Sequence, residues 1–148
     1  MIKVFIDTSA LFAAIYSSSG SARDLLRLRA LGKVSLLISQ LVVEETERNL
    51  RKKASDKLAA YQSLITSTAF TIVPDPSKEQ VVAALAYTAF KDAPIIAAAI
   101  AAEADYVATY DRKDLLDKPE VARNSRLKIV TPDVVVAAVV AEDEDTEE

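Results

Sequence analysis

Four acidic residues stand beside apolar stretches of the sequence and are the strongest candidates for chemistry: Asp7, Glu45, Asp92 and Asp111. The chain has no His and no Cys. This composition excludes a Ser-His-Asp triad, a His general base, thiolate chemistry and the usual zinc sites. Any reaction must therefore use carboxylates, hydroxyls, Lys, Arg or a hard metal ion.

Carboxylates gathered in one cleft need a counter-charge. Two like charges about 4 Å apart cost roughly 1 kcal/mol in water and several times more in a partly buried site. A site with only oxygen ligands suits Mg²⁺ or Mn²⁺. Such ions bridge phosphate oxygens and activate water, which offers a route to phosphodiester hydrolysis that needs no His.

Short, β-rich apolar runs alternate with helical patterns along the chain. Strands are expected at 2–6, 34–38, 70–73, 106–109 and 127–130. Helices are expected at 10–16, 22–31, 40–53, 56–66, 78–90, 95–102 and 133–141. This alternation predicts an α/β fold, namely a three-layer α/β/α sandwich whose central sheet has about five mainly parallel strands.

The expected sheet would bring the acids together. Asp7 and Asp111 follow strands, Asp92 opens a buried helix, and Glu45 lies early in a helix that follows a strand. Because parallel strands end on one rim, these carboxylates should share one cleft. Each has a structural alternative: Asp7 and Asp92 could cap helices, Asp111 could make a turn, and Glu45 could be a surface acid.

Length and charge favour one domain, 1–141, followed by an acidic tail, 142–148, that is expected to be disordered. The tail holds six of the 22 acids, and removing six acids from a chain of net charge −4 leaves +2. No apolar run reaches the roughly 18 residues of a membrane span, and the N-terminus lacks signal-peptide features. We therefore expect a soluble, cytoplasmic protein.

Five short motifs stand out, and the first four contain the four acids: VFIDTSA at 4–10, ISQLVVEE at 38–45, KDAPIIAAA at 91–99, ADYVATYDRKD at 104–114 and IVTP at 129–132. Through these motifs the sequence from Ile2 to about Val140 resembles the PIN domain family, the ribonuclease fold of VapC-type toxins. In the family's second motif the acid follows a Ser or Pro by six positions; counted from Ser39, this spacing selects Glu45 over Glu44.

The resemblance implies roles for individual residues. The four acids Asp7, Glu45, Asp92 and Asp111 would be the catalytic residues and would hold Mg²⁺ or Mn²⁺, directly or through water. The side chains of Thr8, Ser9, Thr109 and Asp114 would orient the ligands or their water. Contacts to RNA phosphates are expected from Arg48, Arg51, Lys52, Arg112 and Lys113.

The leading hypothesis is a metal-dependent endoribonuclease that hydrolyses RNA. The resemblance also implies the toxin of a toxin–antitoxin pair, a cognate antitoxin that fills the acidic cleft with an Arg or Lys, and a homodimer. Two alternatives remain: a non-catalytic PIN-fold interaction module, and an RNA-processing nuclease outside any toxin–antitoxin system. A haloacid-type phosphatase is disfavoured because Ser9 stands where it needs a second Asp.

Overall fold

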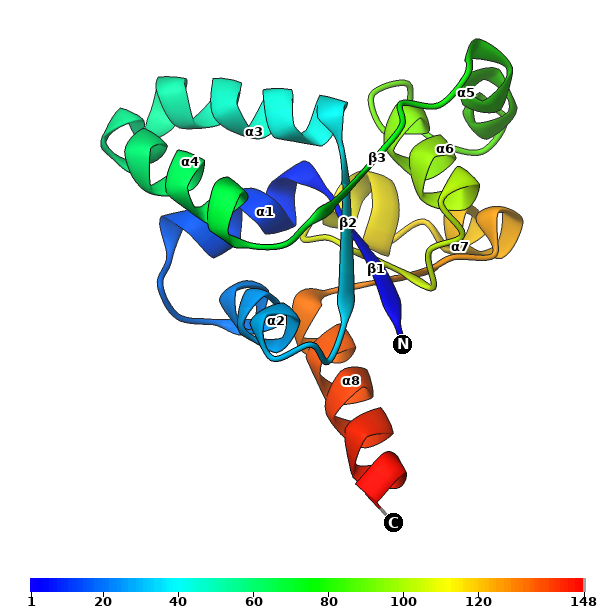
Figure 1. Ribbon diagram of the computed structural model, residues 1–148. Helices are drawn as coiled ribbons and strands as arrows, with labels where there is room; N and C mark the ends of the chain where they lie inside the picture. The colour runs from blue at the N-terminus through cyan, green and yellow to red at the C-terminus, as the bar shows by residue number, and fades with distance from the viewer. Residues whose placement is uncertain (148) are drawn as a thin grey trace.

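The computed structural model describes residues 1–147, with side chains through residue 145 (Figure 1). Its centre is one sheet of five parallel strands in the order β3-β2-β1-β4-β5. This arrangement confirms the predicted α/β fold. The strands are β1 (Lys3–Ile6), β2 (Ser35–Ser39), β3 (Thr71–Val73), β4 (Tyr106–Ala108) and β5 (Lys128–Val130).

Strand β1 lies in the middle of the sheet and is paired on both sides. Phe5 stands opposite Leu37 of β2 and opposite Val107 of β4. Val4, Phe5 and Ile6 are all buried, as a strand covered on both faces requires. The strand order reverses between β1 and β4, so the chain leaves the sheet in opposite directions from these two neighbours. A crevice is expected at such a switch point.

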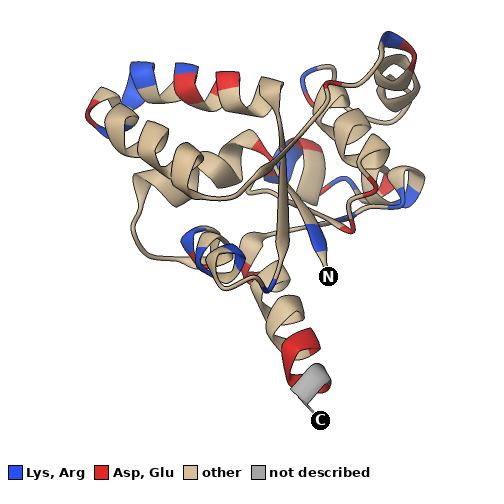
Figure 2. Ribbon diagram, viewed as in Figure 1, with Lys and Arg blue, Asp and Glu red and all other residues tan. Residues whose placement is uncertain are grey.

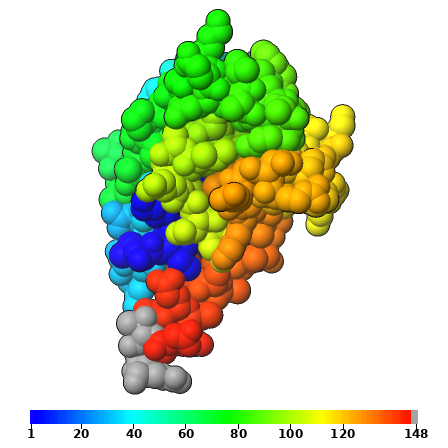
Figure 3. Space-filling view, turned by 90° about the vertical axis from the view of Figure 1, so that its right-hand side faces the viewer, coloured from blue at the N-terminus to red at the C-terminus, as the bar shows by residue number. Residues whose placement is uncertain are grey.

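Helices cover both faces of the sheet. Helices α1 to α4 lie on one side of the strands in Figure 1, and α5, α6 and α7 lie on the other. Figure 3 views the second side, where α5 and α6 in green shades and α7 in orange form the surface. The helices are α1 (Thr8–Tyr16), α2 (Ser21–Ala30), α3 (Gln40–Lys53), α4 (Leu58–Ser67), α5 (Lys78–Leu85), α6 (Ala93–Ala101), α7 (Pro119–Ser125) and α8 (Pro132–Glu147).

Polar side chains that the sequence places before the helices form hydrogen bonds that cap the helix starts. Ser39 accepts a hydrogen bond from the Val42 N–H at the start of α3. Ser77 and Gln80 form a reciprocal capping box at the start of α5. The apolar segment of α6 is buried from Ile95 to Ala99, as expected for a helix that is hydrophobic all round.

The structure departs from the expected elements in several places. Helix α5 ends at Leu85, five residues before the expected end, and turns lead from there to α6. The expected exit loop after β4 winds into a π-helical turn, η2 (Arg112–Leu116). Helix α7 was not expected; it begins at Pro119 and ends before Arg126, whose backbone is left-handed with φ of 64°.

Helix α8 continues beyond the expected end at residue 141 and reaches Glu147. The acidic segment from Glu142 therefore begins inside a helix, and Asp143 forms an ion pair of 2.8 Å with Lys33. Glu148 lies outside the described residues. The division into a domain, 1–141, and a disordered tail, 142–148, stays a prediction.

Across the described residues, none of the helices combines the length and the apolar character that crossing a bilayer would require.

Candidate metal centre

The four predicted acids line one cavity of about 420 Å³ at the carboxyl end of the sheet. Asp7 follows β1, Glu45 lies in the second turn of α3, Asp92 immediately precedes α6, and Asp111 follows β4 by three residues. The cavity thus sits where the strand order reverses. The expectation that these side chains converge agrees with their placement.

Asp7 is held by hydrogen bonds on both carboxylate oxygens. Its Oδ1 accepts from the Ser9 hydroxyl at 2.7 Å and from the Ala10 N–H at 3.0 Å. Its Oδ2 accepts a short hydrogen bond from the buried Thr109 hydroxyl. Asp7 therefore caps α1 and is also fixed to the end of β4, so the structural alternative for this residue is true alongside any chemical role.

Glu45 is oriented by the residue that follows Asp7. The Thr8 hydroxyl donates to Glu45 Oε2 at 2.8 Å, which ties α3 to the start of α1. Asn49 and Lys53 follow Glu45 at successive intervals of four along α3, and both also line the cavity. One face of α3 thus presents an acid, an amide and a cation to the same space.

Asp92 does not cap the helix that it precedes. It lies at the N-cap position of α6, but its side chain makes no capping hydrogen bond. Asp92 is buried, and no hydrogen bond from the described residues reaches its Oδ2 atom. A buried carboxylate oxygen without a hydrogen-bond donor is costly to maintain unless a cation compensates it.

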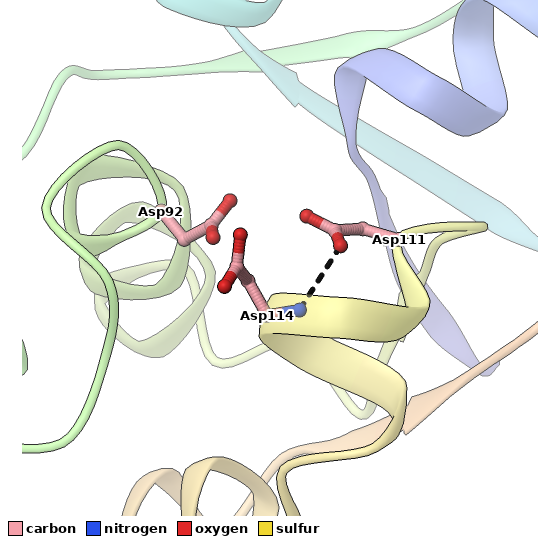
Figure 4. A group of neighbouring side chains, drawn as sticks. All are labelled: Asp92, Asp111 and Asp114. Atoms are coloured by element: carbon pink, nitrogen blue, oxygen red, sulfur yellow. Dashed lines mark hydrogen bonds between the residues drawn. The ribbon is translucent and has the colours of Figure 1, made fainter.

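Asp92, Asp111 and Asp114 form a compact group, which we call the aspartate triad. Each offers an oxygen within 4.8 Å of the others. Figure 4 shows the three carboxylates turned toward one another, Asp92 from the start of α6 and the other two from the turn after β4. The Asp114 N–H donates to Asp111 Oδ1 at 3.1 Å, and this hydrogen bond orients the Asp111 side chain.

Asp7 and Glu45 line the same cavity but are not members of this triad. Within the described part of the chain, the triad is the group of acids spaced closely enough to share one ion. The sequence placed Asp114 in a supporting role, whereas the geometry brings one of its oxygens within 4.8 Å of oxygens of both Asp92 and Asp111. Its backbone turn, η2, causes this approach.

Lys91 contacts all three members of the triad. Its Nζ lies 2.8 Å from Asp111 Oδ2, 3.3 Å from Asp92 Oδ2 and 3.3 Å from Asp114 Oδ2. The Lys91 side chain is 62% exposed, while the Asp92 side chain is 10% exposed. A solvent-exposed ammonium thus partly neutralises the wall of the cavity.

The site shifts the pKa values of its groups in different directions. Burial raises the pKa of Asp7, against the opposing hydrogen bonds from Thr109, Ser9 and Ala10. Burial also raises the pKa of Asp92, although the charge of Lys91 opposes it. For Asp111, burial acts upward, but the hydrogen bond from Lys91 and that from the Asp114 N–H outweigh it and lower the pKa.

The pKa of Lys91 is raised. Burial alone would lower it, but the hydrogen bond to Asp111 and the charge of Asp92 exceed that effect. The ammonium form is therefore retained across the physiological range, and Lys91 acts as a fixed positive charge in the free protein.

None of the five predicted RNA contacts is among the residues that line the cavity. Arg48 and Arg51 border a separate surface hollow with Glu44 and Glu47, and Arg51 pairs with Glu47 at 2.6 Å. Lys52 is exposed at the end of α3, where Figure 2 shows basic positions gathered. Arg112 and Lys113 are exposed in η2 beside Asp111, and Arg112 pairs with Asp117 at 3.5 Å. Their role in RNA binding stays a prediction.

Sequence reasoning did not assign a role to Lys91 or Asn49. The four-residue spacing from Glu45 was a usable signal for Asn49 and Lys53. Lys91 had no such signal, because only the folded chain brings Asp111 and Asp114 to it.

The residues present fit a divalent cation. The donor set consists of carboxylates and hydroxyls, the ligand type that Mg²⁺ and Mn²⁺ prefer. The buried Asp92 Oδ2 receives no hydrogen bond from the described residues, and its nearest cation is the Lys91 ammonium at 3.3 Å. Figure 4 shows the Asp92 carboxylate turned toward those of Asp111 and Asp114. In such a centre Asp92, Asp111 and Asp114 offer oxygens that lie close enough together to share one ion. Asp7 and Glu45 line the same cavity and would hold the ion directly or through water.

Fold and site thus define a class of α/β proteins in which a parallel sheet carries an acidic cavity at the point where its strand order reverses. The family model for the PIN domain matches residues 3–113. The chain belongs to the PIN domain family. No curated protein matches the sequence.

Solved structures support the same fold. PAE2754 from Pyrobaculum aerophilum is 21% identical, with a TM-score of 0.66 over 95% of this chain and 90% of that one. VapBC2 from Rickettsia felis, bound to a fragment of its promoter DNA, is 19% identical, with a TM-score of 0.63 over 86% of this chain and 97% of that one. Mycobacterium tuberculosis VapC20, a toxin that cleaves the sarcin-ricin loop, is 19% identical, with a TM-score of 0.55 over 74% of this chain and 91% of that one.

Proposed function

We propose that this PIN domain is a Mg²⁺- or Mn²⁺-dependent endoribonuclease that hydrolyses RNA phosphodiesters. The observation that carries the proposal is the single cavity lined by Asp7, Glu45, Asp92 and Asp111 in a chain without His. When bound, the ion would supply charge neutralisation at the phosphate and an activated water.

The chain's own side chains would hold the reacting groups in place. Asp92 and Asp111 would provide negative charge at the centre, and Ser9 and Thr109 would keep Asp7 in one orientation through its two oxygens. Thr8 would do the same for Glu45. Such fixed orientation lowers the cost of assembling a reactive geometry.

Cleavage of single-stranded RNA in the presence of Mn²⁺ tests the proposal. Asp7→Asn and Asp92→Asn should each lower the cleavage rate by more than about a hundredfold, because loss of a ligand should exceed the effect of losing an outer-sphere partner. Asp75→Asn is the matched control, since Asp75 is exposed and lies away from this cavity. Equal activity of all four proteins would refute the assignment.

A second candidate function is a non-catalytic interaction module. The contact of Lys91 with all three carboxylates of the triad favours it, because a protein cation already compensates part of the acidic charge. Calorimetric titration with Mn²⁺ separates the two candidates. A non-catalytic module should give no binding heat at this site, whereas the nuclease should give heat that Asp92→Asn removes.

We further propose that the enzyme is the toxin of a toxin–antitoxin pair whose antitoxin fills the cavity with an Arg or Lys. The similarity in fold to VapBC2 supports this role. A small gene adjacent to this one, whose product copurifies with the chain and blocks cleavage, is the expected finding. Its absence, with cleavage retained, would favour an RNA-processing nuclease outside such a pair.

We also propose that the chain forms a homodimer through an apolar surface near α5. Val82, Leu85 and Phe90 are 56%, 37% and 84% exposed, and apolar side chains of this size are favourable at subunit contacts. Light scattering should give twice the chain mass, and Phe90→Ser should shift the protein toward monomer. A monomeric wild type would contradict the proposal.

A further inference from the structure

Lys91 is the group that holds the aspartate triad together in the free protein. The triad comes from two separate segments, the start of α6 and the turn η2, and the Lys91 ammonium lies within 3.3 Å of a carboxylate oxygen from each member. Its Nζ donates a hydrogen bond to Asp111 Oδ2 at 2.8 Å and forms ion pairs with Asp92 Oδ2 and Asp114 Oδ2, each at 3.3 Å. The lysine therefore contacts the same three carboxylates that Figure 4 shows turned toward one another.

The charge at this point remains unbalanced. Three carboxylates with oxygens within 4.8 Å of one another repel each other. One ammonium supplies a single positive charge against up to three negative ones. A divalent cation at the same oxygens would supply twice that charge from a smaller volume, so the two cations are alternatives for one set of ligands.

Lys91 can leave the triad without disturbing the core. Its side chain is 62% exposed, so its departure opens no buried cavity. Its neighbour Asp92 stays in place because the Asp92 N–H is bonded to the Ala89 carbonyl at 3.0 Å and its carbonyl accepts from the Ile96 N–H at 3.0 Å. The four-carbon stem of a lysine also permits a new position by rotation alone.

We propose that Lys91 is a resident counter-ion of the triad, and that a divalent cation must displace its ammonium in order to bind. This inference rests on the proposed function, because it concerns the metal that the nuclease would use. It makes metal loading an exchange of one cation for another. Lys91 is a positioning residue that preserves the triad in the free protein.

The first experiment compares Mn²⁺ affinity by calorimetry in the wild type, Lys91→Gln and Lys78→Gln. Lys78 is an exposed lysine on α5 that makes no ion pair among the described residues, so it controls for loss of one surface charge. Lys91→Gln should bind Mn²⁺ about tenfold more tightly than the wild type, whereas Lys78→Gln should change affinity by less than about twofold. Without metal, Lys91→Gln should melt at a lower temperature than the wild type.

Charge removal alone would also favour cation binding, so a second measurement follows Lys91 itself. The wild-type chain is labelled briefly with an amine-acylating reagent, and the labelling of each lysine is read by mass spectrometry. Saturating Mg²⁺ should accelerate Lys91 labelling several-fold relative to Lys78, because release from the carboxylates frees the amine. Unchanged or slower labelling of Lys91 would overturn the proposal, as would equal Mn²⁺ affinity in the wild type and Lys91→Gln.

These readouts are separate from catalysis. If Mg²⁺ releases Lys91 but no RNA is cleaved, the nuclease proposal fails and the cation exchange stands. If RNA is cleaved with Mn²⁺ and neither measurement changes as expected, the exchange fails and the nuclease proposal stands.

Discussion

At the scale of single residues, the site depends on hydroxyls that serve buried acids. Thr109 is fully buried, donates to Asp7 and accepts from the Asp111 N–H at 3.0 Å. It therefore connects the acid that ends β1 with the acid that follows β4. A side chain of the same shape without the hydroxyl would leave Asp7 Oδ2 without this donor and the Asp111 N–H without this acceptor.

Thr109→Val should lower the free energy of unfolding by about 1–3 kcal/mol, because it leaves a buried carboxylate oxygen without its donor. Urea denaturation measures this effect. Thr66→Val, which removes an exposed hydroxyl bonded to the Gln62 carbonyl, should stay within about 0.5 kcal/mol of the wild type. A Thr109→Val protein as stable as that control would contradict the bridging role.

Tyr61 offers a pH-dependent test of packing between α3 and α4. Burial, with the nearby charge of Glu47, raises the pKa of Tyr61 from 10.0 to about 12, and its hydroxyl donates to the Val43 carbonyl at 2.9 Å. Because the folded-state pKa is the higher one, the stabilising contribution is complete below pH 10 and is lost as the pH rises through about 12.

The difference in unfolding free energy between wild type and Tyr61→Phe should therefore narrow as the pH rises from 10 toward 12. Urea denaturation at a series of pH values measures it. A difference that stays constant over this range would show that the hydroxyl titrates equally in both states.

A site residue could be predicted from the sequence when its position in the fold depends on neighbouring residues alone. Asp7 could be placed because one apolar strand and one helix start fix it. Asp114 was given a supporting role because its approach to Asp92 depends on the π-helical turn η2, for which the sequence shows no distinct signal. Lys91 was missed for the same reason: its partners lie 20 and 23 positions later in the chain.

At the scale of elements, helix caps position the acids as well as starting the helices. Ser39 ends β2, is buried, and caps α3, which carries Glu45 into the cavity. Ser77 caps α5, which does not contribute to the cavity lining. The two serines have similar local chemistry and different distances from the site.

Ser39→Ala and Ser77→Ala should each lower the free energy of unfolding by about 1 kcal/mol, the usual cost of losing a helix cap. Their effects on Mn²⁺ affinity should differ, since only Ser39→Ala loosens the helix that bears Glu45. Denaturation and calorimetry on the same preparations check both statements. An equal loss of affinity in the two variants would indicate a general effect of stability.

The order of elements was predictable because strand and helix periodicities alternate clearly along this chain. The residues at which helices begin and end were harder to predict. The run of alanines and apolar residues after Leu85 keeps a helical composition, yet the chain turns there to bring Lys91 and Asp92 to the sheet edge. Helix α7 has only seven residues, which is too few to show a periodic pattern.

At the scale of the whole molecule, charge is unevenly distributed. Basic residues gather on α2 and at the end of α3, while red positions mark the far part of α8 in Figure 2. The acidic end of α8 is attached by the ion pair between Lys33 and Asp143, whose side chains are 38% and 39% exposed. An exposed pair of this kind contributes little to stability.

Removing residues 142–148 should leave the free energy of unfolding within about 1 kcal/mol of the full chain. It should strengthen RNA binding at low salt, because the net charge changes from −4 to +2 with the loss of six acids. Binding titrations with the metal-site variant Asp92→Asn, which should not cleave, measure the effect. The gain should disappear in high salt, and a gain that persists there would point to a steric cause.

The position of β1 between two partners has a consequence for motion. Amide protons of a strand bonded on both sides exchange with solvent only when large parts of a protein open. Asp7 directly follows that doubly paired strand, whereas Lys91 lies in the turn before α6 and Asp114 in the turn η2. We therefore expect slower amide exchange around Asp7 than around Lys91 and Asp114, so that any adjustment of the cavity to a bound group would occur on the side formed by the turns.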